Sequence, residues 1–489
     1  MSLPDFEALA GRQTVAEFVA KKDQIMTNRD YANFVKNKIK APAMYGRDPL
    51  PIHPMMFDFQ AAIVRWAIRR GRAAIFSDCG TGKSLMQLEW SRQSGDRVLI
   101  FAPLAVAEQT IAEGLKLGIA VRKVARPDAD PGIQITNYEK MEHFIDAPFD
   151  AIVLDESSIL KSLDGKSRTM LIQEFTSIPR RLCCTATPSP NDLSELANHA
   201  EFLGVMSRVE MLATFFVHDS DQSGAAGWRL KGHAQDAFWR WVAKWATYVR
   251  MPSDLGFEDG DFKLPALTIR QETVTSDWKP DGMLFATGLG GIGDRREVRR
   301  ATIDARVDRA ADVVHNHDGQ WLVWCGLNDE GDALEKELGD DCVQIAGKDS
   351  DEQKIAKEKQ WRSGEVKTLI TKGKIFGWGM NWQHCHQTLF LGIGDSYEQY
   401  YQAIRRCWRF GQKHAVDVVI VTSDAEQSVA DNVRRKERDA AMMAEEIVKH
   451  AKDAMRAEVI GTDKQPETYN PTKNMRLPEW AKGTTTCAV

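Results

Sequence analysis

Cysteine is scarce in this chain, which has eight cysteines at irregular spacings among 489 residues. A disulfide-stabilised scaffold is therefore excluded, and a reducing compartment is expected. Long apolar runs are absent as well, because no segment reaches the roughly 18 apolar residues of a membrane span. The N-terminal sequence MSLPDFEALAGRQTVAEF contains acidic residues and lacks the apolar core of a signal peptide. We therefore expect a cytoplasmic protein that does not enter a membrane.

An excess of either charge is also missing. Lys and Arg number 64 and Asp and Glu number 69, which leaves a net charge of -5. A polybasic, histone-like protein is thereby excluded, but a local basic groove for nucleic acid is not, because a large protein can concentrate its cations on one surface. With 43% hydrophobic and 27% charged residues, the composition predicts a folded chain with a sizeable core.

Short β-rich runs alternate with helical patterns in two parts of the chain. This spacing predicts βαβ units on parallel sheets, so we expect an α/β fold with two lobes. The β-rich runs are 73–78, 97–103, 132–139, 151–156 and 180–188 in the first series, and 320–326, 342–347, 367–373, 388–393 and 416–423 in the second. We expect an N-terminal extension in 1–54, a first lobe in 55–205, a mostly helical insertion in 206–318, a second lobe in 319–430, and a helical tail with a flexible C-terminus in 431–489.

The expected insertion contains four aromatic residues at helical spacing. Phe238, Trp241, Trp245 and Tyr248 fall at i, i+3, i+7 and i+10, which predicts one aromatic helix face. Packing against a lobe is favoured, and stacking on nucleic-acid bases is the alternative. Further on, the sequence RREVRR at 295–300 predicts a solvated basic helix face, with a phosphate contact as the alternative.

A phosphate-binding loop is indicated where a β-rich run, a glycine-containing turn and a helical pattern follow one another. Gly80 and Gly82, with Thr81 between them, would let backbone N–H groups surround a phosphate at a helix N-terminus. Lys83 could reach the β- and γ-phosphates, and Ser84 could bind Mg²⁺. The pattern G-x-x-x-x-G-K-[ST] is met except at its first glycine, where Ser77 stands, and an ordinary strand-to-helix turn is the alternative.

Two adjacent carboxylates follow a later β-rich run. Asp155 and Glu156 come directly after AIVL, at the sheet edge where α/β proteins bind ligands. Phosphoryl transfer to water needs such a pair, with Asp155 holding Mg²⁺ together with Ser84, and Glu156 activating the water. A loop start or a helix cap is the alternative explanation for an acidic pair alone.

Six sequence blocks, in this order, resemble the superfamily-two helicases and, among them, the Swi/Snf-like DNA translocases. The resemblance implies RecA-like lobes, ATP and Mg²⁺ as cofactors, adenine recognition by Gln60, a nucleotide contact near Gly379, and coupling of the nucleotide site to nucleic acid through Thr185, Thr187 and Gln402. The compact chain is similar to phage and prophage helicases. The blocks are FQ at 59–60, SDCGTGKS at 77–84, LDESS at 154–158, TATPSPNDLSEL at 185–196, GWGMNWQHC at 377–385 and QAIRRCWRFGQ at 402–412.

The arginines of the last block indicate a function without reference to the family. Arg406 and Arg409 lie three residues apart, so both guanidinium groups could reach across a cleft from one face of a helix. There they would stabilise the charge that develops on a transferring phosphoryl group. A basic helix end with structural arginines is the alternative.

The sequence departs from the family pattern at two places. The second nucleotide block reads DESS where the family usually has DEAH, so Ser157 and Ser158 must make the contacts of the usual third and fourth residues. Arg405 stands where the family has glycine. Neither change removes a group that acts on phosphate.

We therefore expect an ATP-dependent DNA translocase or helicase that contacts nucleic acid independently of sequence, with double-stranded DNA as the expected substrate. Alternatives are a helicase that separates strands of DNA or RNA, a nucleotide-gated motor or recruitment subunit for a separate nuclease or methylase, and a generic P-loop kinase. Cys183, Cys184 and the sequence His384-Cys385-His386 lack the separated pairs of a zinc site, so we expect buried strand residues and a loop.

Overall fold

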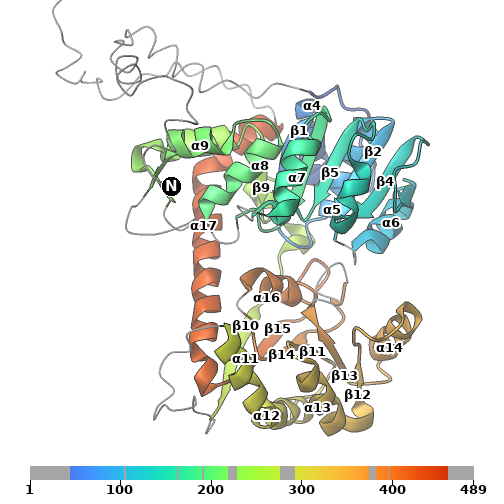
Figure 1. Cartoon of the computed structure of the whole chain (residues 1–489), viewed down its shortest axis with the longest axis vertical. Helices are drawn as coiled ribbons and strands as arrows, with labels where there is room; N and C mark the ends of the chain where they lie inside the picture. The colour runs from blue at the N-terminus through green and yellow to red at the C-terminus, as the bar shows by residue number, and fades with distance from the viewer. Residues whose placement is uncertain are drawn as a thin grey trace, which may run out of the picture.

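Two α/β lobes form the molecule, and one lies above the other in Figure 1. Each lobe is built on a sheet in which all paired strands are parallel, which confirms the predicted fold of two RecA-like lobes. The computed structural model describes residues 45–103, 106–161, 165–189, 192–218, 228–275, 292–373, 381–394 and 396–460.

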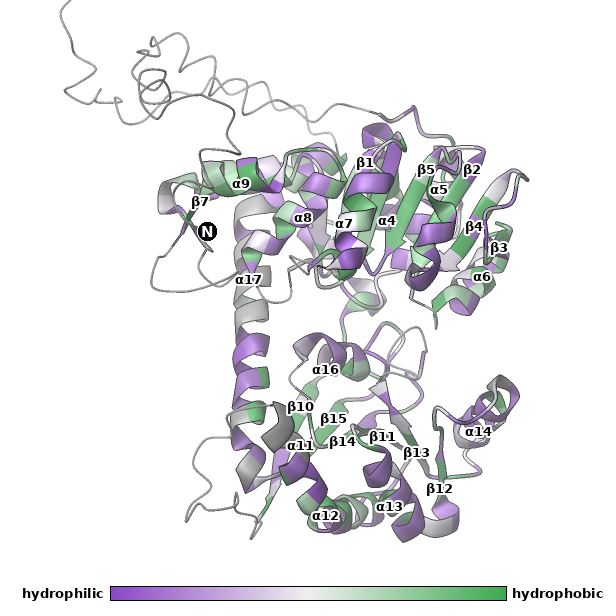
Figure 2. Cartoon of the chain, in the orientation of Figure 1, coloured by the Kyte–Doolittle hydropathy of each residue, from purple (hydrophilic) through white to green (hydrophobic). Residues whose placement is uncertain are grey.

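The first lobe has a seven-stranded sheet with the order β3-β4-β2-β5-β6-β1-β9. Its central strands are mainly hydrophobic after their first residues (Figure 2), because helices cover both faces of a parallel sheet. The strands are β1 Arg72–Ser77, β2 Arg97–Ala102, β3 Val121–Lys123, β4 Gly132–Asn137, β5 Ala151–Asp155, β6 Arg180–Thr185 and β9 Ala246–Val249. The helices are α4 Asp58–Arg70, α5 Lys83–Ser94, α6 Ala107–Lys116, α7 Lys166–Glu174, α8 Leu196–Phe202, α9 Arg208–Phe215 and α10 Gln235–Val242.

The second lobe has a six-stranded sheet with the order β10-β15-β14-β11-β13-β12. Alternate residues of β11 lie in different apolar clusters: Leu322 and Trp324 in one, Trp321 and Val323 in the other. Helices therefore enclose this sheet on both faces, since side chains alternate along a strand. The strands are β10 Leu267–Val274, β11 Trp321–Cys325, β12 Cys342–Gln344, β13 Thr368–Lys372, β14 Gln387–Leu391 and β15 Val416–Ser423. The helices are α11 Ile292–Ala301, α12 Ile303–His315, α13 Asn328–Leu338, α14 Asp351–Ser363, α16 Tyr397–Ile404 and α17 Gln427–Ile460.

The segment expected as a mostly helical insertion contributes strands as well as helices. β9 pairs with β1 of the first sheet, and β10 pairs with β15 of the second. A third pair of strands, β7 Phe216–His218 and β8 Trp228–Leu230, forms an antiparallel hairpin. The segment that connects the lobes thus supplies an edge strand to each large sheet. Each edge strand forms hydrogen bonds with backbone groups of the neighbouring strand that would otherwise have no partner in the sheet.

The four spaced aromatic residues divide between a helix and a strand. Phe238, Trp241 and Trp245 are buried in the core of the first lobe, which confirms packing against a lobe. Phe238 and Trp241 lie on α10, but Tyr248 lies on β9, so the expectation of one helix through all four residues was wrong. The short run Ala246–Val249 is an extended strand and not part of the helix, because it pairs with the edge of β1 that no other strand covers.

The basic sequence at 295–300 is only partly a solvated face. Arg300 is exposed, but Arg299 turns inward and pairs with Glu330, with Nη2 3.0 Å from Oε1, and with Glu426, with Nε 3.4 Å from Oε1. Arg299 therefore joins a buried ionic cluster between helices. The side chains of Arg295 and Arg296 lie outside the described part of the chain.

The long helix α17 runs beside both lobes (Figure 1). At about 1.5 Å per residue it is about 50 Å long. Val433 packs into the core of the second lobe, whereas Met455 and Val459 pack into that of the first. The predicted helical tail therefore packs against both lobes. Among the residues that the structure describes, no helix combines the length and the apolar character that crossing a membrane requires.

Candidate functional site

The predicted phosphate loop connects β1 to α5, as its sequence pattern indicated. Gly80 and Gly82 have φ angles of 90° and 88°, in the left-handed region that favours glycine. A Cβ atom at Gly82 would lie 2.3 Å from Nε2 of Gln60. Any larger residue at Gly82 would therefore displace Gln60 from the loop.

Polar contacts hold the loop in place. Gln60 donates from Nε2 to the carbonyl oxygen of Thr81 at 2.7 Å. The hydroxyl groups of Ser77 and Thr81 lie 2.6 Å apart, so the residue in place of the first glycine stabilises the turn. Lys83 donates to the carbonyl oxygens of Ser77 at 2.7 Å and Asp78 at 3.2 Å. Its ammonium group therefore lies across the loop.

The acidic pair lies at the carboxyl end of β5. Asp155 is 4% exposed, and Glu156, directly after the strand, has a positive φ of 53°. Strands β5, β6 and β1 are neighbours, so the acidic pair, Thr185 at the end of β6 and the phosphate loop all meet at one sheet edge. Parallel strands place their carboxyl ends together, which explains how blocks about 70 residues apart in sequence become adjacent.

Burial changes the acidity of both carboxyl groups. It raises the pKa of Asp155, and it raises the pKa of Glu156 to about 7 against the opposing charge of Lys83. Thr185 donates from Oγ1 to Oε2 of Glu156 at 3.2 Å, and the backbone N–H of Thr187 donates to Oγ1 of Thr185 at 3.1 Å. The two predicted coupling threonines therefore form a chain of hydrogen bonds that ends on Glu156.

The second lobe brings its arginine block to the same place. Arg406 donates from Nη2 to Oε1 of Gln402 at 3.3 Å, and Glu156 lies close enough to influence its pKa. Burial lowers the pKa of Arg406 to about 10, so this guanidinium group remains charged at neutral pH, and burial also lowers the pKa of Arg409. A Cβ atom at Gly80 would lie 2.8 Å from the backbone nitrogen of Phe410. The arginine block is thus packed directly on the phosphate loop.

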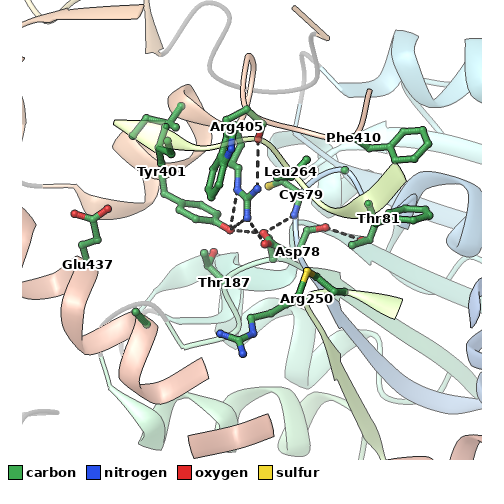
Figure 3. Close-up of a pocket in the computed structure, with 18 of the residues that line it drawn as sticks. Asp78, Cys79, Thr81, Thr187, Arg250, Leu264, Tyr401, Arg405, Phe410 and Glu437 are labelled. Carbon is green, nitrogen blue, oxygen red and sulfur yellow. Dashed lines mark hydrogen bonds and ion pairs between the residues drawn. The ribbon is translucent and has the colours of Figure 1, made fainter. Parts of the chain in front are cut away.

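A cavity of about 560 Å³ extends from this contact (Figure 3). Its walls come from both lobes and from the middle of the chain: the phosphate loop, residues 186–189, the end of β9, α16 and α17. Beside it, the ring of Phe262 lies 5.1 Å from that of Phe57 and 4.6 Å from that of Phe410, measured between centroids. Phe57 precedes Gln60 by one helical turn, so aromatic surface surrounds the predicted adenine contact.

Most of the predicted site residues that the structure describes lie at or next to the contact between the lobes, and Ser84 lies half-buried in the first turn of α5. Gly379 lies outside the described residues, as does Asn191 of the block at 185–196. Cys183 and Cys184 are buried strand residues, as expected. No group of three or more potential metal ligands of the His, Cys, Asp and Glu type occurs among the described residues.

Several residues at the lobe contact were not predicted as site residues: Asp78, Lys161, Glu398, Tyr401 and Arg405 all take part in contacts between the lobes. The only signal in the sequence was Arg405 itself, which departs from the family glycine. Asp78 and Glu398 belong to no charge pattern, because their partners are hundreds of residues away.

Residues 305–411 match the model of the helicase conserved C-terminal domain. The family match therefore covers this segment and not the whole chain. It extends from α12 through the arginine block and includes most of the second sheet. Such a domain supports a protein of the superfamily-one or superfamily-two helicase type, a helicase-family ATPase that acts as a nucleic-acid motor. Among curated proteins, none matches the chain at a significant level.

Proposed function

We propose that the protein is an ATP-dependent translocase of the Swi/Snf-like type that moves along double-stranded DNA. The observation that carries this proposal is the packing of the arginine block on the phosphate loop. Gly80 of the first lobe lies against Phe410 of the second, four residues after Arg406 in the arginine block. A site divided in this way between lobes makes ATP hydrolysis depend on their relative position.

The residues at the sheet edge fit ATP with Mg²⁺. Asp155 is a buried carboxylate and Ser84 supplies a hydroxyl group, and Mg²⁺ prefers oxygen ligands of these kinds. Gly80, Thr81 and Gly82 present a turn at the N-terminus of α5, where a phosphate is favoured by backbone N–H groups and by the helix dipole. Gln60 lies against this turn and would contact the adenine. When bound, Mg²⁺ would neutralise charge on the phosphates.

Glu156 is the proposed general base. Glu156 follows the last residue of β5 and has a positive φ, so the backbone leaves the strand direction at this residue. Thr185 orients the Glu156 carboxylate through a hydrogen bond. Lys83, Arg406 and Arg409 supply positive charge for the γ-phosphate from both lobes. The segment Thr185–Thr187 is hydrogen-bonded to Glu156, so a movement of this segment when nucleic acid binds would change the orientation of the Glu156 carboxylate. These hydrogen bonds would couple ATP hydrolysis to movement along nucleic acid.

ATP turnover should be measured alone and with duplex DNA, single-stranded DNA and RNA, each at several salt concentrations. We expect stimulation by duplex DNA of any sequence, which weakens as salt rises because phosphate contacts release counterions. We also expect the protein to displace a triplex-forming strand from duplex DNA without unwinding the duplex. Unwinding of duplexes would instead favour a strand-separating helicase. Binding of nucleic acid with negligible turnover would favour a recruitment subunit for a separate nuclease or methylase.

Turnover should also depend on pH through Glu156. A general base must be ionised to accept a proton, and burial raises the pKa of Glu156 to about 7. We expect kcat/KM for ATP to rise about tenfold per pH unit below about pH 7 and to level off above it. Measurement of kcat/KM between about pH 5.5 and pH 9 tests this expectation. A profile that is flat through neutral pH would contradict the assignment of the base.

A further inference from the structure

Helix α16 contacts the first lobe at two points that lie outside the expected phosphate chemistry. At one point Arg405 and Tyr401 both contact Asp78 of the phosphate loop. At the other, Glu398 contacts Ser158 and Lys161, which follow the acidic pair. Figure 3 shows the first contact, with Tyr401 and Arg405 directed toward Asp78.

The Arg405 contact is enclosed and held from several sides. The side chains of Arg405 and Asp78 are 7% and 16% exposed. The guanidinium carbon of Arg405 lies 4.4 Å from the ring centroid of Trp408, and Nε of Arg405 donates to the hydroxyl oxygen of Tyr401 at 3.2 Å. Ion pairs shielded from water in this way have a defined geometry, whereas exposed pairs do not.

The Glu398 contact explains the unusual fourth residue of the DESS block. Ser158 is buried and donates from Oγ to Oε1 of Glu398 at 2.6 Å. Lys161 forms an ion pair with the other oxygen of the same carboxylate. Ser157 instead faces its own lobe, with Oγ 3.1 Å from Nε2 of His199 on α8. Of the two serines, Ser158 is thus the one that reaches the second lobe.

The spacing of these residues places both contacts on one face of the segment. Glu398, Tyr401 and Arg405 fall at i, i+3 and i+7, one above the other on a helix, with Gln402 beside them. One contact lies near the start of α16 and the other at its C-cap. A helix held at a single point could pivot, whereas two points along its axis determine both its rotation and its position. Arg406 follows Arg405 immediately, so its place in the site depends on both contacts.

We propose that Arg405 and Glu398 are positioning residues that hold α16 against the nucleotide-binding blocks and so position Arg406 at the contact between the lobes. This inference rests on the proposed ATP hydrolysis. Arg405 does this through Asp78, and Glu398 does it through Ser158 and Lys161. Neither is a catalytic residue. The glycine that the family has in place of Arg405 could not form the first contact.

A double-mutant cycle tests the Arg405 contact. We expect Arg405→Met and Asp78→Asn each to lower kcat for ATP about 10- to 100-fold, because small displacements of a catalytic group cost this much. The double variant should be no slower than the slower single variant, since both changes remove the same contact. Arg405→Lys should recover part of kcat. Arg122→Met, which removes the partly exposed pair with Asp128 far from the lobe contact in sequence, is the matched control and should leave kcat unchanged.

Hydrogen exchange of the full chain without nucleotide gives a readout that needs no ATPase activity. Arg405→Met should speed exchange both in 76–84 and in 397–412, in opposite lobes, whereas Arg122→Met should not. If the wild-type protein hydrolyses no ATP but this paired change appears, the proposed function fails and the contact stands. If Arg405→Met alone does not fold, Tyr401→Phe, which removes only a hydroxyl group, decides by the same two readouts. Multiplicative losses of kcat in the cycle, or exchange that changes in one lobe alone, would overturn the proposal.

Discussion

Replacing Glu156 by glutamine is expected to reduce DNA-stimulated ATP turnover by about 10²- to 10⁴-fold, the range that general-base catalysis contributes. Glutamine has nearly the same shape and can still accept the hydrogen bond from Thr185, but it cannot take a proton from water. ATP binding should remain, because the phosphate loop keeps Lys83 and Gln60. Steady-state turnover and equilibrium binding of a fluorescent ATP analogue measure the two effects separately.

Two further variants show whether the loss belongs to the base. Lys83→Ala should weaken ATP binding as well as turnover, since it removes the ammonium group at the loop. Glu142→Gln changes a carboxylate of the same lobe that is 58% exposed and paired with Lys166, and turnover should stay at the wild-type level. Near-normal turnover of Glu156→Gln would contradict the role given to Glu156.

Replacing Arg306 by methionine is expected to destabilise the second lobe by about 3–5 kcal/mol, the usual cost of removing one partner from a buried ion pair. Arg306 and Glu330 are both fully buried, and Nη1 of Arg306 lies 2.8 Å from Oε1 of Glu330. Arg299 and Glu426 complete the cluster, which therefore contains two charges of each sign. Without Arg306, two carboxylates would share one arginine in a dry interior.

The free energy of opening of β11 and β14, measured from native-state hydrogen exchange, tests this expectation. Arg309 provides a matched control on the same helix. It is 43% exposed and pairs with Glu272, so Arg309→Met should change the free energy by no more than about 1 kcal/mol. Equal effects of the two variants would show that burial of the Arg306 cluster contributes nothing special to stability.

The main strands were predictable because burial on both faces leaves a continuous apolar run in the sequence. All ten predicted runs contain a strand, from β1 and β2 to β14 and β15. In the two large sheets β3, β9 and β10 were missed, since edge strands are short or carry charged side chains, as in the sequence LTIRQETV of β10. The short strands β7 and β8 of the hairpin were missed as well. Tyr248 illustrates the error: its helical spacing from Trp241 was accidental, and pairing with β1 decided its conformation.

Residue types and local spacing by themselves determined the two α/β lobes, the phosphate loop at Gly80–Lys83 and the acidic pair Asp155–Glu156. Each of these features is encoded by residues that are close together in the sequence. The phosphate loop, for example, needs a strand, a turn with glycine and a helix N-terminus in immediate succession. Tertiary structure alone decided the partners of Asp78, Glu398 and Arg299, because an ion pair across a lobe or helix contact leaves no periodic trace in the chain. The exclusion of a disulfide scaffold, in contrast, followed from the number and spacing of the cysteines in the sequence. Cys183 and Cys184 are buried in β6, and what joins the lobes is polar contact and the helix α17.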